Sequence, residues 1–239
     1  IEYVVTVSEG LNRFEIASIV SRLGIGTYDD FIRLTQDREF IQTNLGDDVK
    51  NLEGYLYPET YYVTRASGAK GLAKQMVGKF KESFAKVPTA AGTDIAVALD
   101  KQEIVTLASI IEKETGAPEE RPLISSVFHN RMRKGMRLQT DPTVIYGIWT
   151  STGTWNRNIS RQDLLTPTPY NTYVIPGLPP GPIANPGLPA LMAAVRPAKS
   201  EFLFFVSRND GTHIFSRDYK QHRTAVGDYQ LNRKAREGK

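Results

Sequence analysis

DKQEIVTLASIIEKETG, residues 100–116, has the pattern of one short helix that carries two glutamates at its far end. Asp100 stands at the N-cap position with Glu103 three residues later, which is the spacing of a capping box. Gly116 is expected to end the helix. Apolar residues recur at intervals of three and four, so one face is predicted to be buried; they are Ile104, Leu107, Ala108 and Ile111.

The two glutamates, Glu112 and Glu114, have different neighbours along this helix. Two isoleucines lie one turn before Glu114, whereas Ala108 and Ser109 lie one turn before Glu112. Apolar neighbours desolvate a carboxylate and raise its pKa, and a glutamate that is protonated near neutral pH is what a general acid for glycoside cleavage needs. Two solvated charges at a helix end would give the same pattern, and helix geometry alone leaves both interpretations open.

Length and composition bound the class of protein. The 239 residues, 40% of them hydrophobic, suffice for one large domain or for a small and a medium one. The absence of cysteine excludes disulfides and thiolate chemistry, and three scattered histidines do not indicate a metal centre. A net charge of +4 does not indicate a nucleic-acid partner. No apolar run of about 18 residues is present, and because the chain begins with Ile1, an upstream anchor is left open.

Residues 1–46 are expected to form a small β-α-α unit. Apolar residues alternate over positions 3–7, which predicts a strand, and residues 14–23 and 28–35 have the pattern of two short helices. The unit resembles a LysM-like module, a class that binds glycan chains, and a small spacer domain is the alternative. The rest of the chain, residues 47–239, is expected to be the second domain.

Four tyrosines crowd around Gly54 and Pro58 in residues 52–62, which favours a loop or a strand edge. They could stack on sugar rings or form an aromatic core between the domains. Residues 71–87 predict a basic amphipathic helix whose apolar stripe is core, followed by a linker over residues 88–93.

A further helix is expected over residues 118–135, then a loop that enters a helix at residue 144. Asp141 and Pro142 have the pattern of an N-cap and first helical residue, so Asp141 is assigned a capping role. Gln139 has no such structural task, which makes it a candidate ligand contact.

Residues 149–187 are rich in Pro, Gly, Thr and Asn, and a loop this long in a compact domain is usually functional or disordered. Its aromatic residues and asparagines favour an ordered, functional loop. A small helix over residues 189–194 and a β-hairpin turning at Asn209, Asp210 and Gly211 follow. A last helix begins at Asp218 and leads to a basic run at residues 233–239. The whole pattern predicts an α+β fold.

Five motifs occur together and in order: LASIIEKET at 107–115, NRM at 130–132, LQTDPT at 138–143, YNTY at 170–173 and GLPPG at 177–181. With them the chain resembles the YceG/MltG family of endolytic murein transglycosylases, and residues 52–61 resemble that family's tyrosine-rich motif. The resemblance implies a mixed helical and β catalytic domain with a distantly lysozyme-like active site.

The resemblance also implies the roles of particular residues. The catalytic glutamate of the family is the one followed by Ser or Thr, which here is Glu114 before Thr115. The substrate-binding residues that it implies are Gln139, Tyr170, Asn171, Tyr173 and Glu53. No metal and no cofactor is implied.

The activity that the resemblance implies is that of a lyase. It would cleave the β-1,4 bond between N-acetylmuramic acid and N-acetylglucosamine within peptidoglycan strands without water, leave 1,6-anhydro ends and terminate strand elongation. Its partners would be glycan strands and penicillin-binding-protein synthases. The protein would be held in the bacterial inner membrane by one N-terminal span, with this domain on the periplasmic side. A non-catalytic glycan-binding scaffold and a hydrolytic muramidase are the alternatives.

Overall fold

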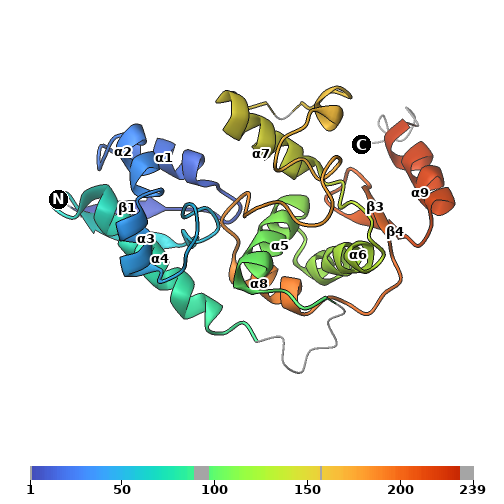
Figure 1. Ribbon diagram of the computed structural model, residues 1–239, viewed down its shortest axis with the longest axis horizontal. Helices are drawn as coiled ribbons and strands as arrows, with labels where there is room; N and C mark the ends of the chain where they lie inside the picture. The colour runs from blue at the N-terminus through green and yellow to red at the C-terminus, as the bar shows by residue number, and fades with distance from the viewer. Residues whose placement is uncertain (1, 89–96, 157, 232–239) are drawn as a thin grey trace.

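The computed structural model describes residues 2–88, 97–156 and 158–231, and it is elongated (Figure 1). Strand β1 and helices α1–α4 lie at one end, strands β3 and β4 with α9 lie at the other, and α5 lies between them. This mixture of helices with two separate antiparallel strand pairs confirms the predicted α+β class. The expected linker and the basic C-terminal run fall, apart from Pro88, outside the described residues.

The strands are β1 (Glu2–Thr6), β2 (Thr60–Thr64), β3 (Phe204–Ser207) and β4 (His213–Ser216). The α-helices are α1 (Arg13–Arg22), α2 (Tyr28–Leu34), α3 (Arg38–Asn44), α4 (Gly68–Phe84), α5 (Lys101–Glu114), α6 (Arg121–Arg133), α7 (Asp141–Thr152), α8 (Leu188–Val195) and α9 (Tyr219–Val226). Single turns occur at Pro118–Glu120 and Asp163–Leu165, and a π-helical turn at Gly227–Leu231 follows α9.

The N-terminal lobe forms around the pairing of β1 with β2. The two strands are antiparallel, with Glu2 opposite Thr64, and the helices α1, α2, α3 and α4 pack beside them. Asn12 caps α1 through a complete capping box with Glu15, whereas α3 was not expected from the sequence. The strand pairing crosses the boundary expected after residue 46, and that boundary and the LysM-like assignment stay predictions.

Helix α5 confirms the central prediction. Asp100 and Glu103 make both bonds of the capping box, at 2.8 and 2.9 Å. Every residue from 104 to 111 is buried, more than the single face predicted, because α6, α7 and α8 all pack against this helix. The helix ends as Thr115 turns into extended backbone (φ −143°, ψ 137°), and Gly116 does not adopt the left-handed conformation expected of a glycine stop.

The start of α7 differs from the prediction. Thr140 is the N-cap, Asp141 is the first helical residue and Pro142 follows it, so the capping role assigned to Asp141 is wrong. Gln139, immediately before the cap, has a left-handed backbone with φ +51°. The carboxylate of Asp141 therefore remains available for another contact.

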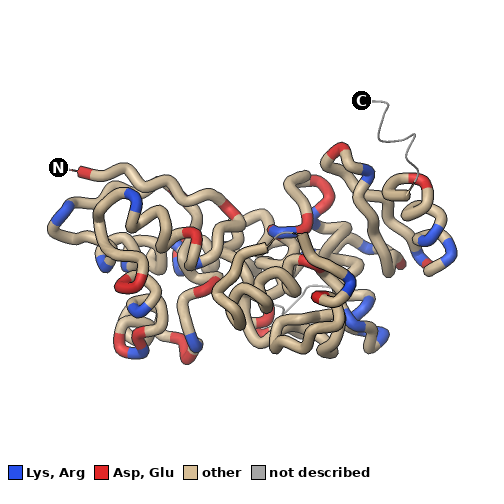
Figure 2. The backbone as a smooth tube through the Cα atoms, turned by 90° about the horizontal axis from the view of Figure 1, so that it is seen from above, with Lys and Arg blue, Asp and Glu red and all other residues tan. Residues whose placement is uncertain are grey.

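The C-terminal hairpin confirms the predicted turn, because β3 pairs with β4 and Asn209 and Gly211 have positive φ. The last helix, α9, begins where it was predicted, with Asp218 as its N-cap. Acidic and basic positions are interspersed over both halves of the molecule (Figure 2). Within the described ranges, no helix has the length and apolar character needed to cross a membrane.

Gly54 joins the N-terminal lobe to the centre of the molecule. Its φ is +86°, and an added Cβ would lie 2.5 Å from Pro182 and 2.7 Å from Val105. We predict that Gly54→Ala lowers the free energy of unfolding by about 2 kcal/mol or more, because strained backbone and steric overlap both act there. Gly78→Ala, which meets no atom within 4 Å, is the control in thermal unfolding. Equal melting temperatures for the two variants would contradict the expectation.

Candidate active site

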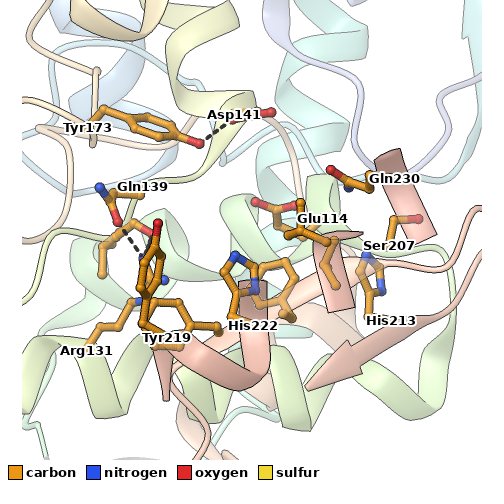
Figure 3. Close-up of a pocket in the computed structure, with 15 residues that line it drawn as sticks. Glu114, Arg131, Gln139, Asp141, Tyr173, Ser207, His213, Tyr219, His222 and Gln230 are labelled. Carbon is orange, nitrogen blue, oxygen red and sulfur yellow. Dashed lines mark hydrogen bonds between the residues drawn. The ribbon is translucent and has the colours of Figure 1, made fainter. Parts of the chain in front are cut away.

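A cavity of about 410 Å³ lies where the end of α5 meets the start of α7, and the C-terminal hairpin and α9 form its opposite wall. Figure 3 shows Glu114 in the middle of the lining residues, with Tyr173 and Asp141 on one side and Tyr219 and His222 on the other. The polar lining residues include Glu114, Arg131, Gln139, Asp141, Tyr173, Ser207, His213, Tyr219, His222 and Gln230.

Glu114 is the last residue of α5, and its carboxylate is partly buried at the cavity wall. Removal from water raises the pKa of this carboxyl to about 7, and the nearby charge of Asp141 acts in the same direction. A hydrogen bond donated by the Thr140 hydroxyl and the charge of Arg131 oppose the rise. Glu114 is therefore available at neutral pH both as an acid and as a base.

Glu112 has a different environment, as the sequence predicted. Its carboxylate accepts one hydrogen bond from Arg121 and one from the backbone N–H of Gly187, both at 3.0 Å. The Arg121–Glu112 ion pair is buried, with only 8% and 4% of the two side chains exposed. Neither glutamate is a solvated helix-end charge, and only Glu114 lines the cavity.

Gln139 lines the same cavity as Glu114, and Figure 3 shows it next to Arg131. Its backbone N–H donates to the Thr172 carbonyl at 3.2 Å, and its side-chain oxygen accepts from Arg131 at 3.4 Å. Arg131 also donates to the carbonyls of Leu138 (2.8 Å) and Leu203 (2.6 Å), so this one guanidinium joins the loop to the hairpin.

Tyr173 and Asp141 form a second polar pair in the cavity. The Tyr173 hydroxyl donates to Asp141 at 2.6 Å (Figure 3). The sequence interpretation missed Asp141 because a cap is the common role of an aspartate before proline. The signal that could have found it is Thr140, an equally good N-cap one residue earlier.

Asn171 lies outside this cavity, which corrects its expected place in a sugar-binding cleft. The residue is 0% exposed, and its amide donates to the carbonyls of Asp163, Leu164 and Thr166. Its oxygen accepts from the Tyr173 N–H at 2.9 Å. Asn171 therefore closes the long loop and sets the position of Tyr173.

Tyr170 also lies outside the cavity around Glu114. Its ring packs edge-on against Tyr146, with 4.9 Å between ring centroids, and it lines a separate hollow of about 210 Å³. The geometry therefore does not support a direct contact between Tyr170 and a substrate bound at Glu114.

Glu53 is 1% exposed and joins the two halves of the molecule. Its carboxylate accepts from the backbone N–H of Arg13 (3.0 Å), the Tyr146 hydroxyl (2.9 Å) and the Asn185 amide (3.1 Å). Burial raises the pKa of this group to about 7, against the charge of Arg13 and the hydrogen bonds. The geometry therefore supports a structural role for Glu53 and not the expected contact with a substrate, because its side chain is buried.

The C-terminal wall of the cavity was not predicted from the sequence. His213 on β4 bonds to Glu120 through both its backbone N–H (2.8 Å) and its ring Nδ1 (2.7 Å), and His222 stacks on Phe204 at 5.0 Å. Nothing in the sequence pattern of these histidines indicates that the hairpin and Glu114 line one cavity. In the part of the chain that the structure describes, no group of three or more His, Asp or Glu residues could hold a metal ion.

These features define a class of protein: an α+β domain whose cavity presents one desolvated carboxylic acid at the end of a buried helix. The chain belongs to the YceG-like family, whose model matches residues 1–228. A crystal structure of a yceG-like protein from Listeria monocytogenes superposes with a TM-score of 0.80 at 32% identity, and covers 92% of this chain and 75% of that one.

Two relatives bear a functional name. An endolytic murein transglycosylase of Bacillus subtilis is 32% identical over 95% of this chain. One of Streptococcus pneumoniae is 29% identical over 94% of it. The chain spans 65% and 44%, respectively, of the lengths of these relatives.

The pKa of Glu114 can be tested without a substrate. We predict that 13C NMR titration of its carboxyl gives a midpoint near 7. Asp141→Asn should lower that midpoint because it removes a nearby negative charge, and Thr140→Val should raise it because it removes a hydrogen bond to the ionised form. Asp29→Asn, in α2 of the other lobe, is the control. A midpoint near 4.5 in the parent would contradict the assignment.

Proposed function

We propose that this protein is a peptidoglycan lytic transglycosylase that cleaves the β-1,4 bond between N-acetylmuramic acid and N-acetylglucosamine within glycan strands. The observation that carries the proposal is Glu114, a single carboxylic acid with its pKa raised to about 7 in a cavity of about 410 Å³. Cavities of this size hold small ligands or a short stretch of a polymer. The names of the relatives support murein as the substrate.

In the proposed reaction, protonated Glu114 donates its proton to the glycosidic oxygen as the bond to the muramyl C1 breaks. Positive charge develops at C1, beside the newly formed carboxylate. That carboxylate then accepts the proton of the sugar's own 6-hydroxyl, whose oxygen bonds to C1. The products are a free 4-hydroxyl and a 1,6-anhydro end, and Glu114 is protonated again. A pKa near 7 suits a group that must serve in turn as acid and base.

The neighbours of Glu114 would orient the reacting groups. The Thr140 hydroxyl donates to the carboxylate and fixes its rotamer, since Thr140 itself is held by its backbone bond to Thr172. Gln139 offers a donor and an acceptor to hydroxyl and acetamido groups, and Tyr173 offers a hydroxyl positioned by Asp141. We propose Gln139 and Tyr173 as the substrate-binding residues among those expected.

Hydrolysis by a muramidase is the second candidate, and Asp141 is the observation that favours it. A second carboxylate on the cavity could activate a water molecule, as in glycosidases that use two acids. The hydrogen bond from Tyr173 occupies one oxygen of Asp141, which favours a positioning role instead.

We further propose that the domain acts at the outer face of the bacterial cell membrane, on an N-terminal anchor, with its N-terminal lobe as a LysM-like glycan-binding unit. Penicillin-binding-protein synthases are the proposed partners, because an enzyme that ends nascent strands must work where they are made. The support is the family resemblance and the murein named for the relatives. Fractionation of cells that contain the full-length protein tests the membrane anchor, and a protein recovered free of membranes would contradict it. Crosslinking in cells tests the contact with the synthases.

We predict that Glu114→Gln abolishes cleavage of purified glycan strands while the protein remains folded, because an amide keeps the shape of the side chain but cannot donate the proton. Chromatography of the digest measures the loss. Glu112→Gln is the matched control, expected to melt at a lower temperature because Arg121 loses the closer of its two carboxylate partners, yet to cleave. Activity retained by the Glu114 variant and lost in the folded Glu112 variant would reverse the assignment.

We predict that Gln139→Ala lowers kcat/KM by about 10- to 100-fold, since one or two hydrogen bonds to the transition state are lost. Its melting temperature should change little, because Thr140 and not Gln139 caps α7 and the side-chain bond to Arg131 is long. Gln139→Asn, which tolerates the left-handed backbone, should recover part of the activity. A variant that melts much lower but cleaves normally would show that Gln139 only braces the loop.

A further inference from the structure

Arg131, on α6, is a buried cation in the wall of the cavity around Glu114. It is 7% exposed, and a buried charge is costly unless an opposite charge compensates it. The other two arginines that are buried in the described chain, Arg13 and Arg121, each have a carboxylate nearby, at 3.9 Å and 3.0 Å respectively. Arg131 forms no ion pair with any described carboxylate, so its charge is left without such a partner.

Backbone carbonyls compensate the Arg131 guanidinium only in part. Its Nε donates to the carbonyl of Leu203 at 2.6 Å, and its Nη1 donates to the carbonyls of Arg137 at 3.1 Å and Leu138 at 2.8 Å. The remaining nitrogen, Nη2, donates to no described group, yet it is not shut off from solvent. Arg131 therefore keeps one terminal nitrogen, with both of its N–H donors, for a ligand.

This guanidinium belongs to the same space as the reacting group. Figure 3 shows the bond that joins it to Gln139, with 3.4 Å between Nη1 and Oε1. Burial lowers the pKa of Arg131, and the charges of Tyr173 and Glu114 oppose this change, so Glu114 is near enough for the two charges to interact. The ring of Phe204 lies 5.0 Å from the central carbon of the guanidinium and helps to hold its plane.

A fixed guanidinium with a free nitrogen and no acidic partner is suited to bind a carboxylate. The glycan strand of the proposed function alternates two amino sugars, and of these only muramic acid carries a lactyl group, on C3. That carbon belongs to the ring whose C1 loses its glycosidic bond. A carboxylate-binding group in the cavity around Glu114 would therefore act on the sugar that is cleaved.

We infer that Nη2 of Arg131 binds a carboxylate carried by the muramyl residue whose bond lies at Glu114. The inference rests on the proposed function and adds to it a determinant of which bond is cleaved. The strand presents two kinds of β-1,4 bond in alternation, and a contact made only by the muramyl sugar selects one of them. The carboxylate belongs either to the lactyl group itself or to the stem peptide attached to it, and the test separates these sources.

The test measures the binding of small ligands to the unaltered protein by NMR titration. N-acetylmuramic acid should bind about 10-fold more tightly than N-acetylglucosamine, the effect of one hydrogen bond between charged groups, because the two sugars differ only in the lactyl group. The methyl ester of N-acetylmuramic acid, which has no charge, should bind like N-acetylglucosamine. N-acetylmuramyl-L-alanine, whose carboxylate lies on the amino acid, represents the stem peptide.

Arg131→Lys keeps the charge but loses the planar fork, so the preference for the carboxylate ligand should fall to about 3-fold or less. Arg22→Lys, the same substitution at an exposed position of α1, is the matched control and should keep the full preference. If Arg131→Lys does not fold, the 15N signals of the Arg131 side chain in the unaltered protein take its place. They should shift on addition of the carboxylate ligand and not of N-acetylglucosamine.

A preference for N-acetylmuramic acid that depends on Arg131 would assign the lactyl carboxylate, and one shown only by N-acetylmuramyl-L-alanine would assign the stem peptide. Equal affinity for both of these ligands and for N-acetylglucosamine would overturn the inference, as would a preference that Arg131→Lys leaves unchanged. In either case a protein that still cleaves murein retains the proposed function. A protein that neither cleaves murein nor binds any of these ligands would overturn both.

Discussion

The removal of the Glu114 carboxylate from water is the interaction on which the site depends. Helix α5 is buried over eight consecutive residues, so its last turn brings Glu114 to the edge of the core rather than to open solvent. The ionised carboxylate is disfavoured there, and the pKa rises to about 7. Its neighbour Glu112 is equally withdrawn from water, but Arg121 and the Gly187 N–H compensate its charge. Of these two glutamates, only Glu114 is thereby left facing the cavity.

A network of hydrogen bonds around the cavity maintains this geometry. Arg131 holds the loop before α7, Asn171 closes the long loop that carries Tyr173, and Thr172 bonds to both Thr140 and Thr143. These groups are buried and well paired, so the side chains that line the cavity project from a loop with little freedom to move. Glu53 likewise holds the two halves of the molecule together, through hydrogen bonds from Arg13 and Tyr146.

The sequence predicted those features that depend on interactions between residues close together in the chain. The capping box of α5, the hairpin at Asn209 and the distinction between Glu112 and Glu114 each depend on residues within a few positions of one another. The roles of Asn171 and Glu53 could not be predicted in this way, since their partners are set by tertiary packing: Glu53 bonds to Asn185, 132 residues away. A polar residue in a motif can bind the substrate or stabilise the fold, and only its burial and its hydrogen-bond partners distinguish the two roles. The wall formed by β3, β4 and α9 was missed for the same reason.

The central claim is that Glu114 acts on the strand's own 6-hydroxyl and not on water. Digestion of peptidoglycan in water enriched in oxygen-18, followed by mass spectrometry of the new strand ends, tests it most directly. Intramolecular attack predicts ends that are 18 mass units lighter than reducing ends, a loss of one water, and that carry no label. Labelled reducing ends would contradict it, and would show that water attacks C1.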